Sequence, residues 1–260
     1  MTTGRKYRTP VIGKMLQVLD YLSRQDASFS DIARALSLPR SSTYVLLQSL
    51  EEVGFVRLLP DNRLYALGFK LYELGALAVR GVNVKEQAMP HLQALCDAVD
   101  LTCHLGCLHG TEAFYLLKLL PRNKLHINSW EGKRISLYSS GVGKALMAWQ
   151  PEEELEALLD ACTFAPVTPM TITDPDRLKR HLAEIRIRQW AMDNEEDGLG
   201  LRCIAAPVFS LQGRVNAAVS VSGPLQQVNE ASIPGLVDAV KKAARAITCS
   251  VGGTYPQSGS

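Results

Sequence analysis

The sequence predicts an α+β protein built from two domains, and three observations support this fold class. Within the first seventy residues, apolar side chains recur at helical spacing in three short segments, and a hairpin pattern follows them. From Leu101 onward, short runs typical of strands alternate irregularly with segments typical of helices. The chain has 260 residues, 47% of them hydrophobic, which is enough for one large or two modest cores.

Charge is distributed unevenly along the chain. Through Asn83 there are eleven lysines and arginines against seven aspartates and glutamates, whereas the remainder has seventeen against nineteen. The net charge of +2 and the 21% of charged residues do not indicate global disorder. The asymmetry therefore favours a basic partner surface near the N-terminus and a nearly neutral C-terminal body.

The two ends of the sequence and its cysteines bear on the compartment. The opening "MTTGRKYRTP" is polar and basic and lacks the apolar core of a signal peptide, and no apolar run reaches membrane-spanning length. Six cysteines in such a chain indicate reduced thiols in a cytoplasmic protein. We expect no cofactor, no metal and no membrane partner. The final "GGTYPQSGS" is rich in glycine and serine, so residues 254–260 are expected to form a disordered tail.

Two helices are predicted at the start of the chain. From Val11 to Leu22 the apolar residues fall on one helical face. A second, shorter helix follows, because Ser28 or Ser30 is suited to cap its first turn. Pro39 stops this helix, since proline cannot continue the backbone hydrogen bonding of a helix interior.

A third helix is expected after the "SLPRSS" break. Ser41 or Ser42 can cap its first turn, and the helix runs to about Val53, where Gly54 ends it. The side chains expected to point into the core are Val45, Leu46, Leu50 and Val53. "FVRLLPDNRLYAL" then predicts two short strands around "PDN", which is a hairpin.

The order helix, helix, short turn, helix, hairpin is that of a winged helix-turn-helix, a fold that places its third helix in the major groove of DNA. Arg40 and the serines beside it suit phosphate contacts or base edges, Gln48 suits adenine, and Arg63 at the hairpin tip suits a flanking groove or phosphate. The alternative is a three-helix module that binds another protein. The expected DNA-binding side chains are Arg40, Ser41, Ser42, Tyr44, Gln48 and Arg63.

This region resembles a known family. "VIGKMLQVLDYL", "SDIARALSLPRSSTYVLLQSLEEVGFV" and "NRLYALGFKLYELG" are similar to the DNA-binding domain of the IclR-type transcriptional regulators of bacteria. The family often carries an arginine in the recognition helix where this chain has Val45, which suggests a different operator. The resemblance implies a homodimer, pairing into a dimer of dimers, on double-stranded operator DNA.

The resemblance also implies a domain division. We expect a winged helix-turn-helix domain at 1–68, a linker helix at 69–83 that helps to form the dimer, and an effector-binding domain at 84–253. The break "RGVN" separates two helical stretches, from Phe69 to about Val79 and from Lys85 to about Val99. The family's effector domain resembles a GAF or PAS-like α/β fold, in which a curved sheet carries helices on its faces.

The pattern after Leu101 predicts the elements of this second domain. The strand-like runs are "LTCHLGCL", "EAFYLLKLL", "KLHINSW", "RCIAAPVFS" and "RVNAAVSVS". Helices fit at about Val142–Trp149, Glu152–Asp160, Pro175–Gln189 and Glu230–Thr248.

The stretch "SSGVGKAL" looks like the end of a phosphate-binding loop. Such a loop requires G-x-x-x-x-G-K-[ST], but Ala145 follows Lys144 here and Tyr138 stands where the first glycine belongs. A nucleotide site is therefore not expected. The amides of Gly141 and Val142, at a helix start, are instead suited to a small carboxylate. The plainer alternative is a glycine cap with no ligand.

The resemblance assigns more of this site. "LYSSGVGKALMA", "MDNEEDGLGLRCIAAPVF" and "AAVSVSGP" are similar to the family's three effector-pocket segments. Carried over by position, Gly141 and Val142 supply backbone amides to the ligand. Ile127 also matches an apolar wall of the family's pocket, but less securely than Ile135 and Leu201 do. The remaining effector-binding residues implied are Asp193, Cys203, Ser220 and Ser222 as polar partners, with Ile135 and Leu201 as apolar walls. The polar set agrees with members that sense glyoxylate or pyruvate, so a 2-oxo or 2-hydroxy acid is expected. A sugar acid or an aromatic acid is the alternative.

Metal binding and thiol catalysis are less well supported by the sequence. "MDNEEDG" lacks the spacing of a calcium loop, and in the strand "CHLGCLH" Cys103 and His104 point to opposite faces, which disfavours zinc. A thiol enzyme that pairs Cys203 with His104 or His126 is a second class of function, and a purely structural module is a third. The DNA-reading domain favours a regulator that senses an acid and is not an enzyme, and the sequence leaves open whether this regulator is a repressor or an activator.

Overall fold

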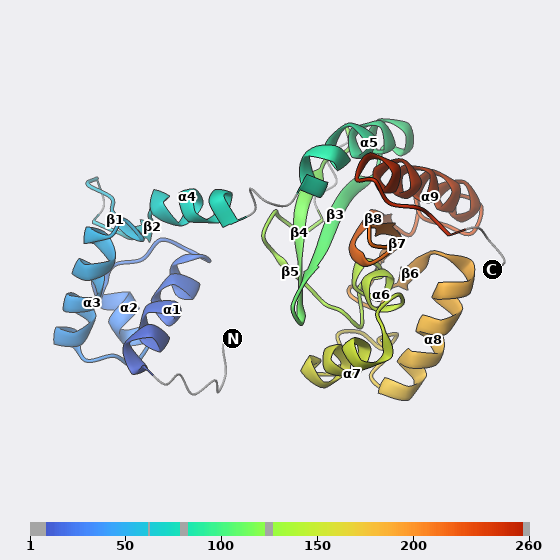
Figure 1. Ribbon diagram of the computed structural model, residues 1–260. Helices are drawn as coiled ribbons and strands as arrows, with labels where there is room; N and C mark the ends of the chain where they lie inside the picture. Colours follow the sequence, from blue (N-terminus) through green and yellow to red (C-terminus); the bar gives the residue numbers. More distant parts are fainter. Residues whose placement is uncertain (1–8, 62, 79–82, 123–126, 257–260) are drawn as a thin grey trace. The chain divides into compact units, whose positions relative to one another are not determined.

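The computed structural model describes residues 9–61, 63–78, 83–122 and 127–256. They form two compact units that divide after Val82 (Figure 1). This division falls next to the expected boundary between linker and effector domain at 83/84. None of the helices in these ranges combines the length and the apolar character that crossing a bilayer requires.

The first unit has the element order of a winged helix-turn-helix, as the sequence predicts. Three helices come first, a hairpin follows, and a further helix leads out of the unit. Their bounds are α1 Pro10–Leu22, α2 Phe29–Ala35, α3 Arg40–Glu52, β1 Val56–Leu58, β2 Tyr65–Leu67 and α4 Phe69–Ala78.

Local caps explain where these helices begin and end. Ser28 is the N-cap of α2, and its hydroxyl accepts from the amide of Asp31 at 3.2 Å. The expected serine cap of α3 is wrong, because Pro39 occupies the N-cap and no side chain caps that helix. Proline is suited to this place, since its missing N–H would lack a helical partner there. Gly54, with φ of +74°, ends α3 in the left-handed conformation that glycine adopts without strain.

The small core of this unit corrects one face of α3. Leu47 and Leu50 are buried against Val18 and Ile32. Val45 and Val53, expected to point inward, are 61% and 55% exposed. The register of α3 is therefore rotated relative to the prediction, and Val45 lies on the outer face of the recognition helix.

The hairpin forms the wing. β1 pairs antiparallel with β2, and Val56 lies opposite Leu67. Ala27 extends this sheet by exchanging backbone hydrogen bonds with Tyr65 at 3.0 and 2.8 Å. Arg63 is exposed at the turn, where the amide of Leu59 donates to the carbonyl of Leu64 at 2.8 Å.

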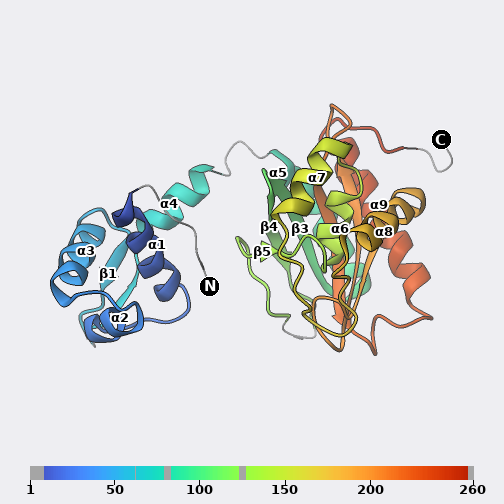
Figure 2. The same cartoon turned by 90° about the horizontal axis from the view of Figure 1, so that it is seen from below.

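The second unit is an α+β domain around one curved antiparallel sheet, in agreement with the predicted fold class (Figures 1 and 2). The strand order is β5-β4-β3-β8-β7-β6. In chain order the elements are α5 Asn83–Val99, β3 Thr102–His109, β4 Glu112–Leu119, β5 Arg134–Ile135, α6 Gly141–Met147, α7 Glu152–Ala161, α8 Pro175–Arg188, β6 Ala191–Asn194, β7 Leu201–Phe209, β8 Val215–Pro224 and α9 Ile233–Ser250.

Helices cover both faces of this sheet. α5 and α9 pack together on one face, and α6 lies on the other with α8 beside it (Figures 1 and 2). Because side chains alternate along a strand, Ile204 and Val221 point to the α9 face while Cys203 and Ser222 point to the α6 face. Because helices bury both faces, a polar side chain on a central strand is costly unless it has a hydrogen-bond partner.

Three sequence expectations differ from this fold. The stretch "KLHINSW" contains no strand over 127–130, and its residues 124–126 lie outside the described residues. The strands β5 and β6 escaped prediction because runs of two and four residues are too short to show a period. Residue 255 departs from the expected disorder of 254–260, since the ring of Tyr255 packs edge-on against Phe209 with centroids 5.0 Å apart, and residues 257–260 lie outside the described residues.

Candidate functional site

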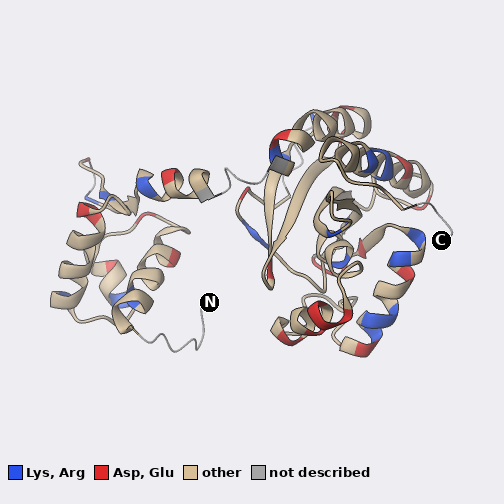
Figure 3. Cartoon of the chain, viewed as in Figure 1, with Lys and Arg blue, Asp and Glu red and all other residues tan. Residues whose placement is uncertain are grey.

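The outer face of α3 carries the side chains expected to read DNA. All five of the expected side chains on α3 are exposed: Arg40, Ser41, Ser42, Tyr44 and Gln48. Val45, which is also exposed, lies on the same face. Their spacing of three and four residues places them along one side of the helix. Few acidic residues lie on this helix before its last turn (Figure 3), so its N-terminal half can approach phosphates without repulsion.

Two contacts hold this face in order. The guanidinium of Arg40 lies over the ring of Phe29, 5.2 Å from its centroid, which is a cation–π contact. The amide nitrogen of Gln48 donates to the hydroxyl of Tyr44 at 2.9 Å. The wing adds Arg63 and a residue that sequence reasoning missed, Arg57 on β1, which is also exposed. The alternation of "VRL" across the hairpin was the available signal for Arg57.

In the second unit, the strand register brings the predicted polar residues into two adjacent rows. Asp193 on β6 lies opposite Cys203 on β7, and Cys203 lies opposite Ser222 on β8. The next row contains Ser220 and, across from it on β3, His104. Directly paired residues of antiparallel strands point to the same face. All five side chains are therefore on the face that α6 covers.

The start of α6 lies against these rows. An ideal Cβ built on Gly141 would come within 3.0 Å of the Cys203 sulfur and 3.5 Å of the Asp193 nitrogen. A Cβ on Gly143 would come within 2.2 Å of the carbonyl oxygen of Ser136. Close packing against backbone thus requires a glycine at 143, and the contact at 141 is tight, which explains the motif without a nucleotide. Ser140 caps the helix by accepting from the Gly143 amide at 2.9 Å, while the Gly141 and Val142 amides have no partner among the described residues.

Val142 connects the polar rows to the apolar side of the site. Val142 and Ile135 both lie over Gly106 on β3, at 2.5 and 2.8 Å from the position of an ideal Cβ there. Leu201 is placed at the opposite end, two residues before Cys203 on the same strand face. Ile127 is half-buried in the described part of its loop, and its carbonyl accepts from Lys118 at 2.8 Å.

Asp193 is a buried acid held by the backbone that follows it. One carboxylate oxygen accepts from the amides of Glu196 and Asp197 at 2.7 and 3.2 Å. Burial raises the pKa of Asp193 to about 7 despite these hydrogen bonds and the charge of Lys144. Near neutral pH both the protonated and the ionised forms of Asp193 are therefore populated, and the protonated form can donate a hydrogen bond.

The cysteine of the site is a neutral thiol. Burial, together with the nearby charge of Asp193, raises the pKa of Cys203 to about 12, although the hydroxyls of Ser222 and Ser220 oppose this rise. His104 bonds through Nε2 to the hydroxyl of Ser129 at 2.8 Å, and burial lowers its pKa to about 3. Neither group is prepared for a thiolate–imidazole pair, and His126 lies outside the described residues.

Two polar atoms on this face are buried without a partner. Within the described residues the Nδ1 of His104 makes no hydrogen bond, and the hydroxyl of Ser220 makes none of normal geometry, although it lies close enough to the thiol of Cys203 to lower the pKa of that thiol. They belong to directly paired residues and so lie side by side. Tyr115 stacks on His104 with ring centroids 4.4 Å apart, and burial next to Cys203, Asp197 and Asp193 raises its pKa. Sequence reasoning missed Tyr115 as a member of the site.

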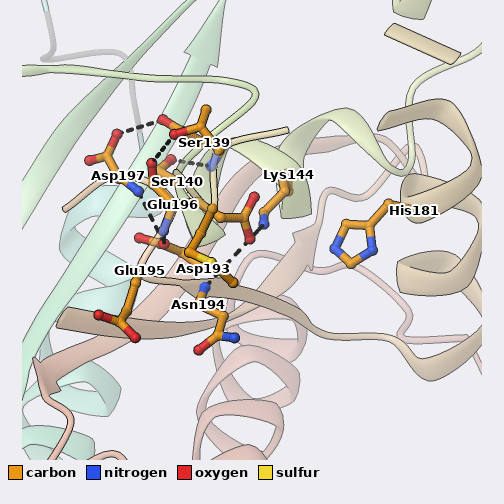
Figure 4. A network of polar contacts seen from close by, with 12 residues as sticks. Ser139, Ser140, Lys144, His181, Asp193, Asn194, Glu195, Glu196 and Asp197 are labelled. Carbon is orange, nitrogen blue, oxygen red and sulfur yellow. Dashed lines mark hydrogen bonds and ion pairs between the residues drawn. The ribbon is translucent and has the colours of Figure 1, made fainter. Parts of the chain in front are cut away.

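A buried ion pair lies behind these groups (Figure 4). Lys144 of α6 is fully buried and pairs with Glu196, whose other carboxylate oxygen has no partner. The hydroxyl of Ser139 donates to Asp197 at 2.6 Å, so consecutive residues of the "NEED" turn are tied to α6 and to the turn before it. No local pattern around Lys144 predicts that this side chain is buried. Within the described ranges, no cluster of three or more His, Cys, Asp or Glu side chains is arranged to hold a metal ion.

The two units together define a class of protein. A winged helix-turn-helix with an exposed polar recognition face reads DNA, and the attached α+β domain carries buried polar side chains on the sheet face that α6 covers. A family model described as IclR helix-turn-helix domain matches residues 11–60, and one described as bacterial transcriptional regulator IclR C-terminal matches residues 76–249. The chain belongs to the IclR family of DNA-binding transcriptional regulators.

Individual relatives agree with this assignment. The chain is 36% identical over 224 residues to the uncharacterized HTH-type transcriptional regulator RhmR of Escherichia coli, covering 86% of each chain. It is 32% identical to XynR of the same organism, covering 94% of this chain and 97% of that one. The crystal structure of the Thermotoga maritima IclR matches with a TM-score of 0.78 and 34% identity, covering 94% and 99% of the two chains.

The burial of Asp193 generates a prediction on stability and pH. The folded protein holds a proton on Asp193 up to about pH 7, whereas the unfolded chain releases it near the ordinary value of 3.8. The stability that this proton contributes is present in acid and is lost as pH rises from about 4 to about 7. Asp193→Asn removes the dependence, so the variant should exceed the wild type at pH 8 by at most about 4 kcal/mol.

The measurement is urea unfolding followed by tryptophan fluorescence between pH 4 and pH 8. All three tryptophans, Trp130, Trp149 and Trp190, belong to the second unit, so the signal reports that unit. Stability curves that run parallel for the two proteins would contradict a raised pKa for Asp193.

The buried ion pair generates a second prediction. Lys144→Met leaves Glu196 buried with no positive partner, which should cost on the order of 3–5 kcal/mol of unfolding free energy. Lys179→Met is the matched control, because Lys179 pairs with Glu156 on the surface and both side chains are more than a third exposed. The control should cost less than about 1 kcal/mol in the same urea assay. Equal losses in both variants would refute the special role of Lys144.

Proposed function

We propose that this regulator binds operator DNA through α3 and the wing, and that a small organic acid bound between α6 and the sheet controls that binding. The observation that carries the proposal is the pair of buried atoms without a partner, the Ser220 hydroxyl and His104 Nδ1, which lie on the sheet face that the start of α6 covers. Buried polar groups without partners are rare and costly. A ligand can supply the missing hydrogen bonds to the Ser220 hydroxyl and His104 Nδ1 while its carboxylate accepts from the free amides of Gly141 and Val142.

The charge of the site favours one orientation of such an acid. A carboxylate gains from directed amide hydrogen bonds at a helix start. Asp193 is opposed to a second anion when it is ionised, but its raised pKa lets it accept a proton and donate to the ligand. Ser220 and Ser222 then meet the oxo or hydroxyl group of a 2-oxo or 2-hydroxy acid, such as glyoxylate or pyruvate.

Relatives support a carboxylic acid as the ligand class. A solved structure of an IclR homolog from Microbacterium hydrocarbonoxydans in complex with 4-hydroxybenzoate matches this chain with a TM-score of 0.79 and 26% identity, covering 93% of this chain and 98% of that one. A Salmonella typhimurium relative that is 28% identical over 255 residues is named acetate operon repressor. Close packing of Gly141 on Cys203 favours a small acid over a sugar acid or an aromatic acid.

We also propose repression by a homodimer, which pairs further into a tetramer. α4 exposes Phe69, Tyr72 and Leu77, which are 76%, 68% and 51% exposed. A helix with exposed large apolar side chains is suited to pack against the same helix of a second copy. Two reading heads on a pseudo-palindromic site raise an affinity that one short helix cannot supply.

The effector proposal predicts a selective loss of ligand affinity. Calorimetric titration of the wild type with glyoxylate and with pyruvate should show binding, and Ser220→Ala should weaken it roughly tenfold, since losing one buried polar partner costs about 1–3 kcal/mol. Thr173→Ala, which removes an exposed hydroxyl elsewhere in the same unit, is the control. Operator affinity without acid should be equal in all three proteins.

Two results would count against this proposal. If no small carboxylic acid binds the wild type, the sensor assignment fails. If the acid binds equally well to Ser220→Ala, the ligand lies elsewhere and the residue assignment fails while the DNA-binding function stands.

The DNA assignment predicts different effects for two residues of α3. Arg40→Ala should weaken binding to all sequences and lower the slope of log affinity against log salt by about 1, because one phosphate contact is lost. Gln48→Ala should change sequence preference more than affinity. Arg24→Ala is the charge-matched control, since Arg24 is exposed on the first unit outside α3. The measurement is fluorescence anisotropy over a salt series, and identical slopes for Arg40→Ala and Arg24→Ala would contradict the assignment.

A further inference from the structure

A second polar pocket lies in the same unit but outside the effector site. It has a volume of about 430 Å³ and is formed by α8, β6 and the segments that flank them. Met192 and Asn194 of β6 line it, whereas Asp193 between them points to the effector face. The charged and titratable side chains that line it are Arg177, Arg180, His181, Glu184, Arg188 and Glu196.

Three of the side chains that line this pocket each carry a buried polar atom that has no hydrogen-bond partner among the described residues. They are Oε2 of Glu196, Nε2 of His181 and Nη2 of Arg188. The Glu196 side chain is only 8% exposed, so its free oxygen is not satisfied by bulk water. Each such atom is costly when it is buried alone. Their convergence on one pocket indicates a ligand that offers both a negative group and hydrogen-bond donors.

The arginine of this set is held in place for such a contact. Its Nε donates to the carbonyl of Trp190 at 2.8 Å, and its guanidinium lies over the Trp190 ring, 4.4 Å from the centroid. Both contacts fix the planar guanidinium and leave Nη2 of Arg188 free. An arginine that is already ordered loses little further entropy when it binds an anion.

The surrounding charges favour an anion. Three arginines line the pocket against two glutamates, and Lys144 neutralises Glu196 from behind (Figure 4). Burial and the nearby charges of Lys144 and Arg188 lower the pKa of His181, so its ring is neutral at pH 7. The ring nitrogen Nδ1 lies 3.4 Å from a carboxylate oxygen of Glu184. A proton on Nδ1 leaves Nε2 as an acceptor inside the pocket. Lysine and arginine positions recur along α8 (Figure 3).

We propose that this pocket is a second anion-binding site, which takes a small hydroxylated acid whose carboxylate or phosphate group pairs with Arg188 and the rim arginines. Hydroxyl groups of the ligand donate to the free atoms of Glu196 and His181. The site goes beyond the proposed effector site, because it uses the opposite side of β6 and none of the residues assigned to the effector. Glu196 is the one link between the two, since its amide donates to Asp193 while its side chain lines the second pocket.

The test is calorimetric titration of the full chain with two probes that share hydroxyl groups and differ in the anionic group, D-gluconate and glycerol 3-phosphate. We expect at least one probe to bind with one site per chain, and the preferred probe identifies the anionic group. Arg188→Gln should weaken that probe at least about tenfold, and Arg180→Gln, at the exposed rim, about threefold.

Two control variants separate this site from the effector site and from general electrostatics. Lys179→Gln removes one positive charge from α8 outside the pocket and should bind within about twofold of the wild type. Ser220→Ala should leave the probe's affinity unchanged. Because Arg180 is exposed, its variant keeps the test valid even if Arg188→Gln does not fold.

Three outcomes would overturn the proposal. Neither probe binds the wild type at concentrations on the order of 10 mM. The preferred probe binds equally to the wild type and to a folded Arg188→Gln. Affinity is lost in Ser220→Ala and kept in the arginine variants, which would mean that the probe occupies the effector site. The effector proposal itself is unaffected by the first two results.

Discussion

The close approach of the α6 start to the sheet is the constraint on which the second unit depends. Gly141 lies on Cys203, where a Cβ would be a tight fit, and Gly143 lies on the loop at Ser136, where a Cβ has no room. This contact places the start of α6 against the polar rows of the sheet, and Lys144, one helical turn later, is fully buried. A single packing requirement thus sets both the polarity of the site and the need for Glu196 as the partner of Lys144.

The second consequence of that contact is electrostatic. Enclosing the sheet face removes water from Asp193, Cys203 and His104, and burial moves each of their pKa values toward the neutral form. A face lined by neutral groups accepts an anion at lower cost than one lined by carboxylates. Desolvation therefore allows a site that includes the acidic segment "MDNEEDG" to bind an acid. The positive charge of Lys144 is paired with Glu196.

The fold and part of the site were accessible from the sequence for identifiable reasons. The helix-turn-helix order followed from helical spacing and turn residues. The placement of Ser220 and Ser222 on one face of the sheet followed from the alternation of side chains along one strand. The rotation of α3 that exposes Val45 was missed, because Leu46, Leu47 and Val45 are consecutive apolar residues and periodicity cannot choose among them. Tyr115 and the Lys144–Glu196 pair depend on contacts between distant segments, which spacing does not record.

The "NEED" turn at residues 194–197 connects β6 to α6 and to the segment just before α6. The amides of Glu196 and Asp197 hold the carboxylate of Asp193, the side chain of Glu196 holds Lys144 on α6, and Asp197 accepts from Ser139 just before α6. A proton or a ligand that changes the charge on Asp193 acts directly on the hydrogen bonds of this turn. A ligand shifts a conformational equilibrium only by its difference in affinity for the two states. This turn concentrates groups able to supply that difference, because it contacts the acid of the site, the buried lysine and Ser139, the residue before the cap of α6.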